Sequence, residues 1–370
     1  MKILTVLGAR PQFIKAAMVS HAIDTYNKAH ETVIVEKIVH TGQHFDSNMS
    51  EVFFEQMNIP KPDYNLTISG LSHGAMTGRM LEKIEEVLDI EKPDCLLVYG
   101  DTNSTLAGAL AASKYHIPVV HVEAGLRSYN MLMPEEVNRI LTDRVSSLLL
   151  CPTDQAVINL KAESFPFNKG SQFQQSIINT GDVMYDAVIY YSKRAINEVK
   201  LSSLGVKEHG YGLCTLHRQE NTEDPSKLKN ILSSLQEIAK NDYPIVLPLH
   251  PRTRNKIKDL DGNGWLDGLT IIDPVGYLEM QRLQMDAKII LTDSGGVQKE
   301  AFFHQVPCIT LRDETEWVET VDLGWNKLAG ANKEKILSYA REDNVFASEV
   351  AYPYGKGNAA QKIIESLVTM

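Results

Sequence analysis

The sequence predicts an α/β protein built from mostly parallel, doubly wound sheets. Short apolar runs rich in β-branched residues alternate with amphipathic segments along the chain, and this alternation is typical of parallel strands joined by helices. Turns containing glycine or proline close many of the apolar runs. The chain has 370 residues, which is enough for two domains of ordinary size.

Composition narrows the class of protein. Hydrophobic residues make up 43% and charged residues 23%, as expected for a soluble globular protein. The formal net charge of −10 argues against nucleic acid or an anionic membrane as the main partner. No apolar run approaches the roughly 20 residues that span a bilayer, and the first residues read as a strand rather than a signal peptide.

The cysteines predict a reducing compartment. Cys95, Cys151, Cys214 and Cys308 are scattered and form no CxxC pair, so we expect reduced thiols in the core of a cytoplasmic protein. His40 and His44 flank a turn, and their spacing is not that of a helical metal pair. We expect no metal site.

The first half of the chain alternates strands and helices. Pro11 and Pro134 stand where a helix would begin, because proline suits the first helical position, and Asn103 or Ser104 would cap another helix. We expect strands at residues 2–7, 32–40, 95–99, 118–122, 149–151 and within 177–183. Helices are expected at residues 12–26, 46–57, 72–88, 105–115 and 135–148.

Polar stretches at residues 163–175 and 201–210 interrupt the alternation, which restarts at Tyr211. Strands are expected at residues 212–216, 244–249, 269–272, 287–291 and 307–311, and helices at 226–240, 277–285, 297–303, 332–341 and 359–367. We therefore predict a first domain over residues 1–187 and a second over 188–350, with a junction near 185–205. Residues 351–370 should end in a helix that packs back on the first domain.

The stretch from Ile289 to Glu300 predicts an anion site. An apolar strand ends at Asp293, and Ser294, Gly295 and Gly296 lead into an amphipathic segment. Glycines let a ligand approach the backbone, and a helix N-terminus attracts negative charge. These residues could cradle a phosphate while Glu300 meets ligand hydroxyls. The alternative is a turn whose glycines serve only steric needs.

Polar residues gather at the predicted carboxyl ends of strands. Arg10, Asp101, Glu123 and His217 each lie at or just after such an end. In a doubly wound sheet these ends open onto one crevice, so the four side chains can converge. Individually each could be a helix cap or a surface charge.

Glu135 begins a predicted helix and lies four residues before Arg139. An ordinary helical ion pair would explain this spacing. In the functional interpretation, Glu135 joins Glu123 in the crevice. Crowded carboxylates raise one another's pKa, so that one donates a proton while another accepts.

Further basic side chains follow strands of the second domain. Arg218 and His250 come after two successive strands, and Arg312 after a third. Together with Arg10, the arginines could neutralise a diphosphate. Each one alone could be a solvated surface charge.

Taken together, these blocks resemble the non-hydrolysing UDP-N-acetylglucosamine 2-epimerase family. The resemblance runs nearly from end to end and follows one order. It rests on GARP at 8–11, TGQH at 41–44, GDT at 100–102, HVEAGLR at 121–127, PEE with NR at 134–139, HR with EN at 217–221, TDSGGVQ with Glu300 at 292–300, Arg312 with TE at 315–316, and PYG with Gly357 at 353–357. It implies a GT-B-like fold, with two Rossmann-like domains facing a central cleft.

The resemblance implies a reaction and its residues. Members of the family eliminate UDP to give a 2-acetamidoglucal and add it back after a proton reaches the other face of C2. By position, Asp101, Glu123, Glu135 and His217 would handle protons. The implied substrate-binding residues are Arg10, Gln43, His44, Arg139, Arg218, His250, Tyr277, Ser294, Gly295, Gly296, Glu300 and Arg312. No metal and no NAD are needed, and the family is usually dimeric, so we expect a homodimer.

Departures from the typical members suggest a branch. Gln12 and Lys299 each replace a glutamate, Trp317 replaces an arginine, and residues 128–133 replace a longer segment. These variants resemble the branch acting on UDP-2,3-diacetamido-2,3-dideoxy-glucuronate in surface polysaccharide synthesis. Losing two negative charges suits a sugar that carries a carboxylate.

Alternative functions remain open at this point. The first is epimerisation of UDP-N-acetylglucosamine, and the second is a GT-B glycosyltransferase, which would need an acceptor site. A hydrolysing epimerase and a nucleotide-sugar sensor are further alternatives.

Overall fold

The computed structural model describes residues 1–31, 33–43, 54, 57–168, 174–342 and 352–370. It divides into two compact units, Met1–Ala187 with Tyr352–Met370, and Val188–Ala351. We call these unit 1 and unit 2 and describe each by itself. His44 and most of the helix expected at 46–57 lie outside the described residues. No described helix is long and apolar enough to cross a membrane.

Unit 1 contains a parallel sheet of seven strands in the order β3-β2-β1-β4-β5-β6-β7. The central strands are buried on both faces, as helix-covered parallel strands require. Starting from β1, the chain builds outward in one direction and then crosses back to build in the other. Such a crossing is a doubly wound topology, and it directs the loops after β1, β4 and β5 to one edge. The strands are β1 (Lys2–Leu7), β2 (Val35–His40), β3 (Tyr64–Asn65), β4 (Cys95–Tyr99), β5 (Val119–Val122), β6 (Leu148–Cys151) and β7 (Ser176–Asn179).

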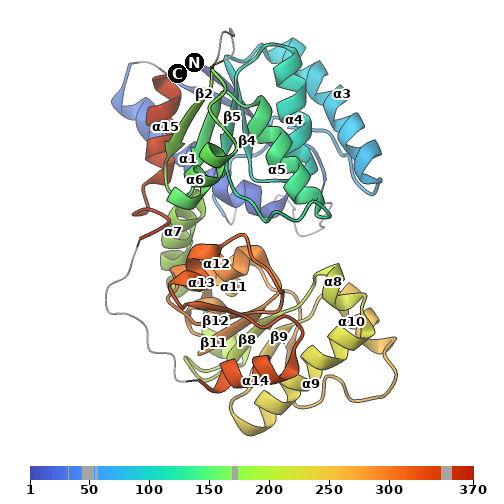
Figure 1. Ribbon diagram of the computed structural model, residues 1–370. Helices are drawn as coiled ribbons and strands as arrows, with labels where there is room; N and C mark the ends of the chain where they lie inside the picture. Colours follow the sequence, from blue (N-terminus) through green and yellow to red (C-terminus); the bar gives the residue numbers. More distant parts are fainter. Residues whose placement is uncertain (32, 44–53, 55–56, 169–173, 343–351) are drawn as a thin grey trace. The chain divides into compact units, whose positions relative to one another are not determined.

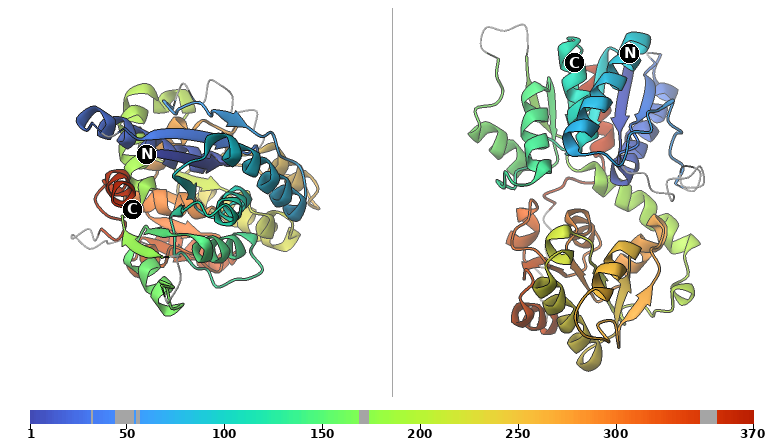
Figure 2. Two further views of the ribbon diagram at one scale, coloured as in Figure 1. Left: turned by 90° about the horizontal axis from the view of Figure 1, so that it is seen from above. Right: turned by 90° about the vertical axis from the view of Figure 1, so that its right-hand side faces the viewer.

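Helices cover both faces of this sheet. Three of them, α3, α4 and α5, pack side by side on one face, while α1 and α15 pack together on the other (Figures 1 and 2). The chain ends therefore lie near each other within unit 1. The helices are α1 (Arg10–Ala29), α3 (His73–Glu91), α4 (Asn103–Lys114), α5 (Pro134–Val145), α6 (Asp154–Ala162), α7 (Val183–Glu198), which continues into unit 2, and α15 (Ala359–Val368).

Unit 2 repeats the plan with six parallel strands in the order β10-β9-β8-β11-β12-β13. Apolar residues pack on both faces of its sheet. The strands are β8 (Gly212–Thr215), β9 (Ile245–Pro248), β10 (Thr270–Ile272), β11 (Ile289–Thr292), β12 (Cys308–Thr310) and β13 (Asn326–Leu328). Its helices are η1 (Leu201–Leu204), α8 (Gln219–Thr222), α9 (Pro225–Asn241), α10 (Pro251–Lys258), α11 (Tyr277–Met285), α12 (Gly295–Phe303), α13 (Val318–Asp322) and α14 (Lys333–Arg341).

The predicted fold class is confirmed, because both units have alternating strands and helices around a parallel sheet. All four cysteines are free and buried, as expected. The boundary between the units, at residues 187 and 188, lies inside the helix α7, which the sequence did not predict. Val183, Ala187, Tyr191 and Ala195 are buried at intervals of four, a helical period that the sequence does contain.

Gln12 connects the carboxyl ends of β1 and β4. Its Oε1 accepts hydrogen bonds from the backbone N–H groups of Gly8 and Ala9 at 2.8 and 3.0 Å. Its Nε2 donates to the carbonyl of Tyr99 at 2.7 Å and to the hydroxyl of Thr105 at 3.0 Å. The side chain is buried, so the amide satisfies groups that water does not reach. Gln12 therefore fixes the turns that lead to Arg10 and Asp101.

We expect Gln12→Met to lower the free energy of unfolding by about 2–4 kcal/mol, because buried donors and acceptors lose their partners. Denaturant unfolding followed by circular dichroism measures the change. Thr25→Val, on the exposed side of the same helix, should change stability by less than about 0.5 kcal/mol. Equal losses in the two variants would contradict the role given to Gln12.

Candidate active site

Three carboxylates lie together at the carboxyl edge of the unit 1 sheet. Asp101 follows β4, Glu123 follows β5, and Glu135 lies in the first turn of α5. Both Glu123 and Glu135 act electrostatically on Asp101 and raise its pKa. The structure thus brings together the three acidic residues of unit 1 that the sequence singled out.

Asp101 is held from the side of α5. Its carboxylate pairs with the guanidinium of Arg139, and its backbone carbonyl accepts a hydrogen bond from Asn138 at 2.9 Å. Burial raises the pKa of Asp101, the positive charge of Arg139 opposes that rise, and Glu123 adds to it. The net effect is a pKa of Asp101 above its ordinary value.

Glu123 is buried and pairs with the ammonium of Lys15 from α1. Its φ is +74°, a conformation that non-glycine residues rarely adopt and that costs free energy. The neighbouring Gly100 leaves space for the carboxylate, since an added Cβ there would lie 3.1 Å from Glu123 Oε2. Strained backbone and cleared space together aim this side chain into the site.

The adjacent acids of α5 differ in function. Glu136 is fully buried and accepts hydrogen bonds from the backbone N–H groups of Ser128 and Tyr129 and from Arg139. These contacts fix the loop after β5. Glu135 is half-buried and stays near Asp101, so only Glu135 of this pair is placed for proton transfer.

Two further predicted residues lie at the same edge of unit 1. Arg10 is half-buried as the first residue of α1. The Oε1 of Gln43 accepts hydrogen bonds from the backbone N–H and the hydroxyl of Ser104, at 3.0 and 2.7 Å. Gln43 thereby anchors its own loop to α4.

In unit 2, His217 follows β8 and pairs with Asp293, which follows β11. His217 Nδ1 lies 3.1 Å from Asp293 Oδ1, and 55% of the histidine side chain is exposed while Asp293 is fully buried. Burial alone would raise the pKa of Asp293, but hydrogen bonds from the ring of His217 and from the backbone of Arg218 and His217 lower it. An ionised carboxylate only accepts, so Nδ1 carries the proton and Nε2 can take one.

The turn before α12 has the geometry of an anion site. Ser294 precedes the helix, and an added Cβ at Gly295 would lie 2.2 Å from Glu316 Oε1. A side chain at Gly295 would therefore force Glu316 to move, whereas Gly296 is exposed. Arg312 is buried and pairs with Glu316 at 3.1 Å, and its Nε and Nη2 have no hydrogen-bond partner among the described residues. Unfilled guanidinium donors beside a helix N-terminus suit a phosphate.

The other predicted residues of unit 2 are placed as follows. Glu300 is buried in α12 and accepts a hydrogen bond from Gln284 at 2.7 Å. Tyr277 begins α11 and packs edge-on against Tyr191. Arg218 is half-buried before α8, and the exposed His250 caps α10 by accepting a hydrogen bond from the N–H of Arg252.

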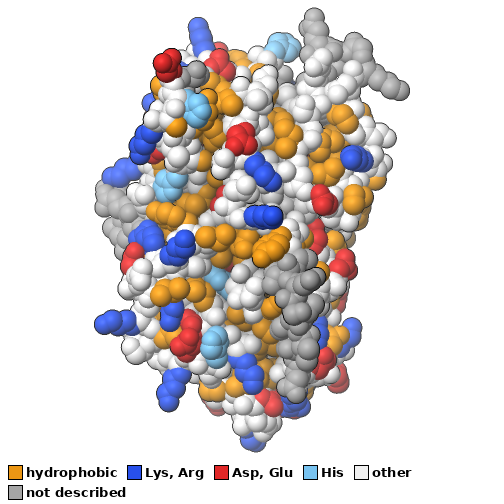
Figure 3. All heavy atoms as spheres, turned by 90° about the vertical axis from the view of Figure 1, so that its left-hand side faces the viewer, with side chains coloured by type: hydrophobic (Ala, Val, Ile, Leu, Met, Phe, Trp, Pro, Cys, Tyr) orange, Lys and Arg blue, Asp and Glu red, His pale blue; other side chains and the backbone are white. Residues whose placement is uncertain are grey.

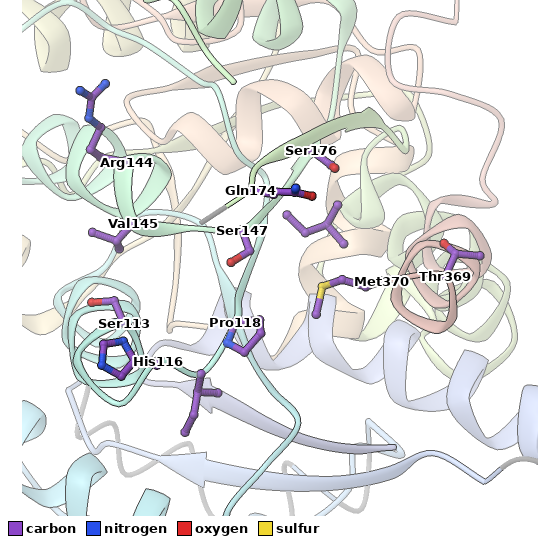
Figure 4. A pocket seen from close by; sticks show the side chains of 12 residues that line it. Ser113, His116, Pro118, Arg144, Val145, Ser147, Gln174, Ser176, Thr369 and Met370 are labelled. Carbon is purple, nitrogen blue, oxygen red and sulfur yellow. The ribbon is translucent and has the colours of Figure 1, made fainter. Parts of the chain in front are cut away.

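A large cavity of unit 1 lies away from these residues. It measures about 940 Å³ and is lined by residues that precede or begin β5, β6 and β7, including Pro118, Ser147 and Ser176, and by Met370 (Figure 4). These are the amino ends of the strands, opposite the edge that carries the carboxylates. This cavity is not part of the candidate site.

One possible metal cluster occurs among the described residues of unit 2. Ligand atoms of Glu208, His209 and Asp286 lie within 4.8 Å of one another. Two of the three residues are exposed, and Asp286 pairs with Arg282 at 3.0 Å. The cluster precedes β8 and β11, at the edge of the sheet opposite His217, so it offers nothing to the candidate site.

Sequence reasoning gave no role to Lys15 and Asp293. Lys15 pairs with Glu123, and Asp293 pairs with His217. Lys299, which the sequence singled out as a departure, is buried with its ammonium 3.9 Å from the ring centroid of Trp317. Asp293 directly follows the apolar run of β11, the signal used for Asp101, and could have been found in this way. The partners of Lys15 and Lys299 are distant in sequence and carry no local signal.

Comparison with known proteins identifies the family. Residues 27–368 match the sequence model of the UDP-N-acetylglucosamine 2-epimerase family. The chain belongs to this family. It is therefore an isomerase, a nucleotide-sugar 2-epimerase.

Similar proteins cover the whole chain. The UDP-2,3-diacetamido-2,3-dideoxy-D-glucuronate 2-epimerase of Pseudomonas aeruginosa is 54% identical over 100% of both chains. The solved UDP-GlcNAc 2-epimerase of Methanocaldococcus jannaschii, in complex with UDP-GlcNAc and UDP, is 42% identical with a TM-score of 0.87 over 100% of both chains. The enzyme of Neisseria meningitidis bound to UDP-GlcNAc is 34% identical with a TM-score of 0.85, again over 100% of both. The predicted GT-B-like fold and family are confirmed.

We expect Asp293→Asn to lower kcat at least about 10-fold, because the imidazole of His217 loses the acceptor that orients it. In a His217→Gln background the same change should alter kcat by less than about twofold, since residues that act together are not additive. Steady-state kinetics of the four proteins completes the cycle. Asn221→Ala, which removes another donor to Asp293 but keeps the imidazole contact, is the matched control. Independent, additive losses would show that Asp293 does not act through His217.

The pair of Asp101 and Arg139 predicts a pH effect. Arg139 lowers the pKa of Asp101, so Arg139→Gln should raise that pKa and move the corresponding limb of the kcat/KM profile to higher pH. Arg139→Lys keeps the charge and should move it less. Profiles of the three enzymes test this, and a limb that stays fixed in Arg139→Gln would remove Asp101 from the pH dependence.

Proposed function

We propose that this enzyme interconverts the two C2 epimers of UDP-2,3-diacetamido-2,3-dideoxy-D-glucuronate, the gluco and manno isomers. The observation that carries the proposal is the cluster of Asp101, Glu123 and Glu135. Burial and the two glutamates raise the pKa of Asp101, while Arg139 lowers it. The 54% identity to the P. aeruginosa enzyme named for this substrate supports the choice of sugar.

The reaction begins by elimination, without hydrolysis. A base removes the C2 hydrogen, the bond between C1 and the phosphate oxygen breaks, and UDP leaves together with that electron pair. The product is a 2-acetamidoglucal with a double bond between C1 and C2. A proton then adds to C2 from the opposite face, and the phosphate oxygen of UDP attacks C1. Atoms and charge balance with no redox cofactor.

Residues of unit 1 suit the proton transfers. Asp101, with its raised pKa, and Glu123, paired with Lys15, have different proton affinities because their environments differ. Such a difference lets one residue donate while the other accepts. Glu135 and His217 complete the proposed set of acid/base groups.

The diphosphate would bind where positive charge and free donors gather. Arg312, with two unfilled donors, and the turn of Ser294, Gly295 and Gly296 are the proposed diphosphate site of unit 2. Arg10 and Arg218 would add positive charge to UDP. Stabilising UDP as a leaving group lowers the barrier to breaking the bond at C1.

The remaining residues would recognise the nucleoside and sugar. Glu300, which accepts a hydrogen bond from Gln284, would bind the ribose hydroxyls. Tyr277 would lie against the uridine, and Arg139, Gln43, His44 and His250 complete the proposed binding set. Of these, His44 lies outside the described residues.

A second candidate substrate is UDP-N-acetylglucosamine. The solved enzymes of M. jannaschii and N. meningitidis, which bind UDP-GlcNAc, share the fold of this chain at TM-scores of 0.87 and 0.85. The two candidate sugars differ by a C6 carboxylate and an acetamido group at C3. The proposal therefore depends on discrimination between these groups.

The setting of the enzyme follows from the same proposal. We propose a cytoplasmic homodimer that supplies a uronate sugar for a surface polysaccharide such as O-antigen. Side chains of both signs are interspersed on the face shown in Figure 3. The formal net charge of −10 makes nucleic acid an unsuitable partner.

Incubation with each nucleotide sugar in D₂O tests the proposed function. We expect NMR to detect deuterium at C2 in both epimers of the uronate sugar. We also expect kcat/KM for this sugar to be at least about 100-fold higher than for UDP-N-acetylglucosamine, because a buried charge of the enzyme would lose its partner when the sugar lacks the carboxylate. Comparable kcat/KM values for the two sugars would overturn the uronate assignment.

The same experiment separates the other reactions. A glycosyltransferase would leave C2 unlabelled, and a hydrolysing epimerase would accumulate free UDP irreversibly. The variant His217→Gln should retain the fold and lose at least about 100-fold in kcat, as expected for a lost acid/base group.

A further inference from the structure

His121 is a fully buried histidine that lies two residues before Glu123, in β5. Both of its ring nitrogens have close polar partners. Nδ1 lies 2.7 Å from Asp143 Oδ1, and Nε2 lies 2.8 Å from the backbone carbonyl oxygen of Gly100. The ring thus bridges α5 and the loop after β4.

Each partner of the ring accepts hydrogen bonds, and a carbonyl oxygen cannot donate one. Asp143 also accepts from Arg127 at 2.7 Å and from the N–H of Gly125 at 3.2 Å, so its carboxylate is ionised in this arrangement. A neutral imidazole would direct one lone pair at an oxygen at 2.7 or 2.8 Å, which is repulsive. Only a ring with protons on both nitrogens satisfies both contacts.

The surrounding charges balance such a cation. Arg127 and His121 both face Asp143, and the guanidinium of Arg127 also pairs with Glu163 at 2.6 Å. Two positive and two negative groups then form a neutral network. A buried charge is tolerated only when it is paired and hydrogen-bonded, and this network meets both conditions.

We propose that His121 carries a proton on both ring nitrogens and that, with Asp143, it positions the carboxylates of unit 1. This proposal rests on the acid/base roles proposed above for Asp101 and Glu123. The ring holds the carbonyl of Gly100, the residue before Asp101. Asp143 holds the N–H of Gly125, two residues after Glu123.

The network therefore fixes the two loops relative to each other. Glu123 has a φ of +74°, so the loop after β5 leaves its strand in a conformation that needs external support. Acid/base catalysis loses about 100-fold in rate when a reacting group is misplaced by about 1 Å. His121 is a positioning residue, since it touches the loops and not the reacting atoms.

Nitrogen-15 NMR of the full chain with labelled histidine tests the protonation state directly. The chain has 11 histidines, so the signals of His121 must be assigned. They are the signals that disappear in the variant His121→Gln or shift in the variant Asp143→Asn. We expect signals of two protonated ring nitrogens for His121 at neutral pH. A single unprotonated nitrogen at neutral pH would overturn the proposal.

Two variants test the positioning role, because each keeps half of the bridge. The amide of His121→Asn can take the place of Nδ1 toward Asp143, and that of His121→Gln the place of Nε2 toward Gly100. We expect each to lower kcat about 100-fold with KM within about threefold. The matched control is His30→Gln, at the exposed histidine that follows α1 as its C-cap, which should retain wild-type kcat.

The outcomes separate this inference from the proposed function. Absence of epimerase activity in the wild-type enzyme would contradict the proposed function. The NMR experiment would still decide whether the ring of His121 carries two protons. An active wild type whose two variants lose only thermal stability, with kcat unchanged for the folded protein, contradicts the positioning role.

Discussion

Each unit of this protein depends on one buried carboxylate that gathers the loop carrying its candidate acid/base residues. In unit 1 Asp143 accepts hydrogen bonds from His121, Arg127 and the backbone of Gly125. In unit 2 Asp293 pairs with the ring of His217 and accepts hydrogen bonds from the backbone of His217 and Arg218. Burial alone would raise the pKa of both aspartates, but their donors lower it. Ionised anchors of this kind are rigid because removing any donor leaves a buried charge unsatisfied.

Such anchoring explains how short strands can support precise chemistry. A strand of four or five residues ends abruptly, and the functional side chains stand on the irregular backbone that follows it. Glu123 has a positive φ, and its neighbour Gly100 has one as well. These conformations persist because hydrogen bonds from distant helices hold them in place. Preorganised groups need little rearrangement during reaction, which is the main source of electrostatic catalysis.

The sequence predicted the fold and the strand-end residues well, because hydrophobic period and turn residues are local signals. Asp101, Glu123 and His217 could each be found from their position after an apolar run. The helix α7 was missed, although Val183, Ala187, Tyr191 and Ala195 repeat at helical spacing, because the polar stretches on either side dominated the interpretation. The partners of the strand-end residues could not be predicted from local signals. For example, Lys15 and Glu123, which are in contact, are 108 positions apart in the sequence.

Gln12 and Lys299, the two substitutions that the sequence linked to a carboxylated sugar, have different surroundings in the structure. Gln12 is buried, and its amide nitrogen donates to a backbone carbonyl, so a carboxylate there would meet an acceptor instead of a ligand. Its effect on substrate charge is therefore indirect, through the turn before Arg10.

Lys299 instead lies in α12, one turn from Gly295, and its ammonium stacks on Trp317. Lysine and tryptophan at these positions are both departures from typical members, and the two side chains are in contact. A cation held on an indole beside an anion site acts on the charge of the ligand directly. Of the two positions, Lys299 is therefore the one whose charge lies near the proposed phosphate site.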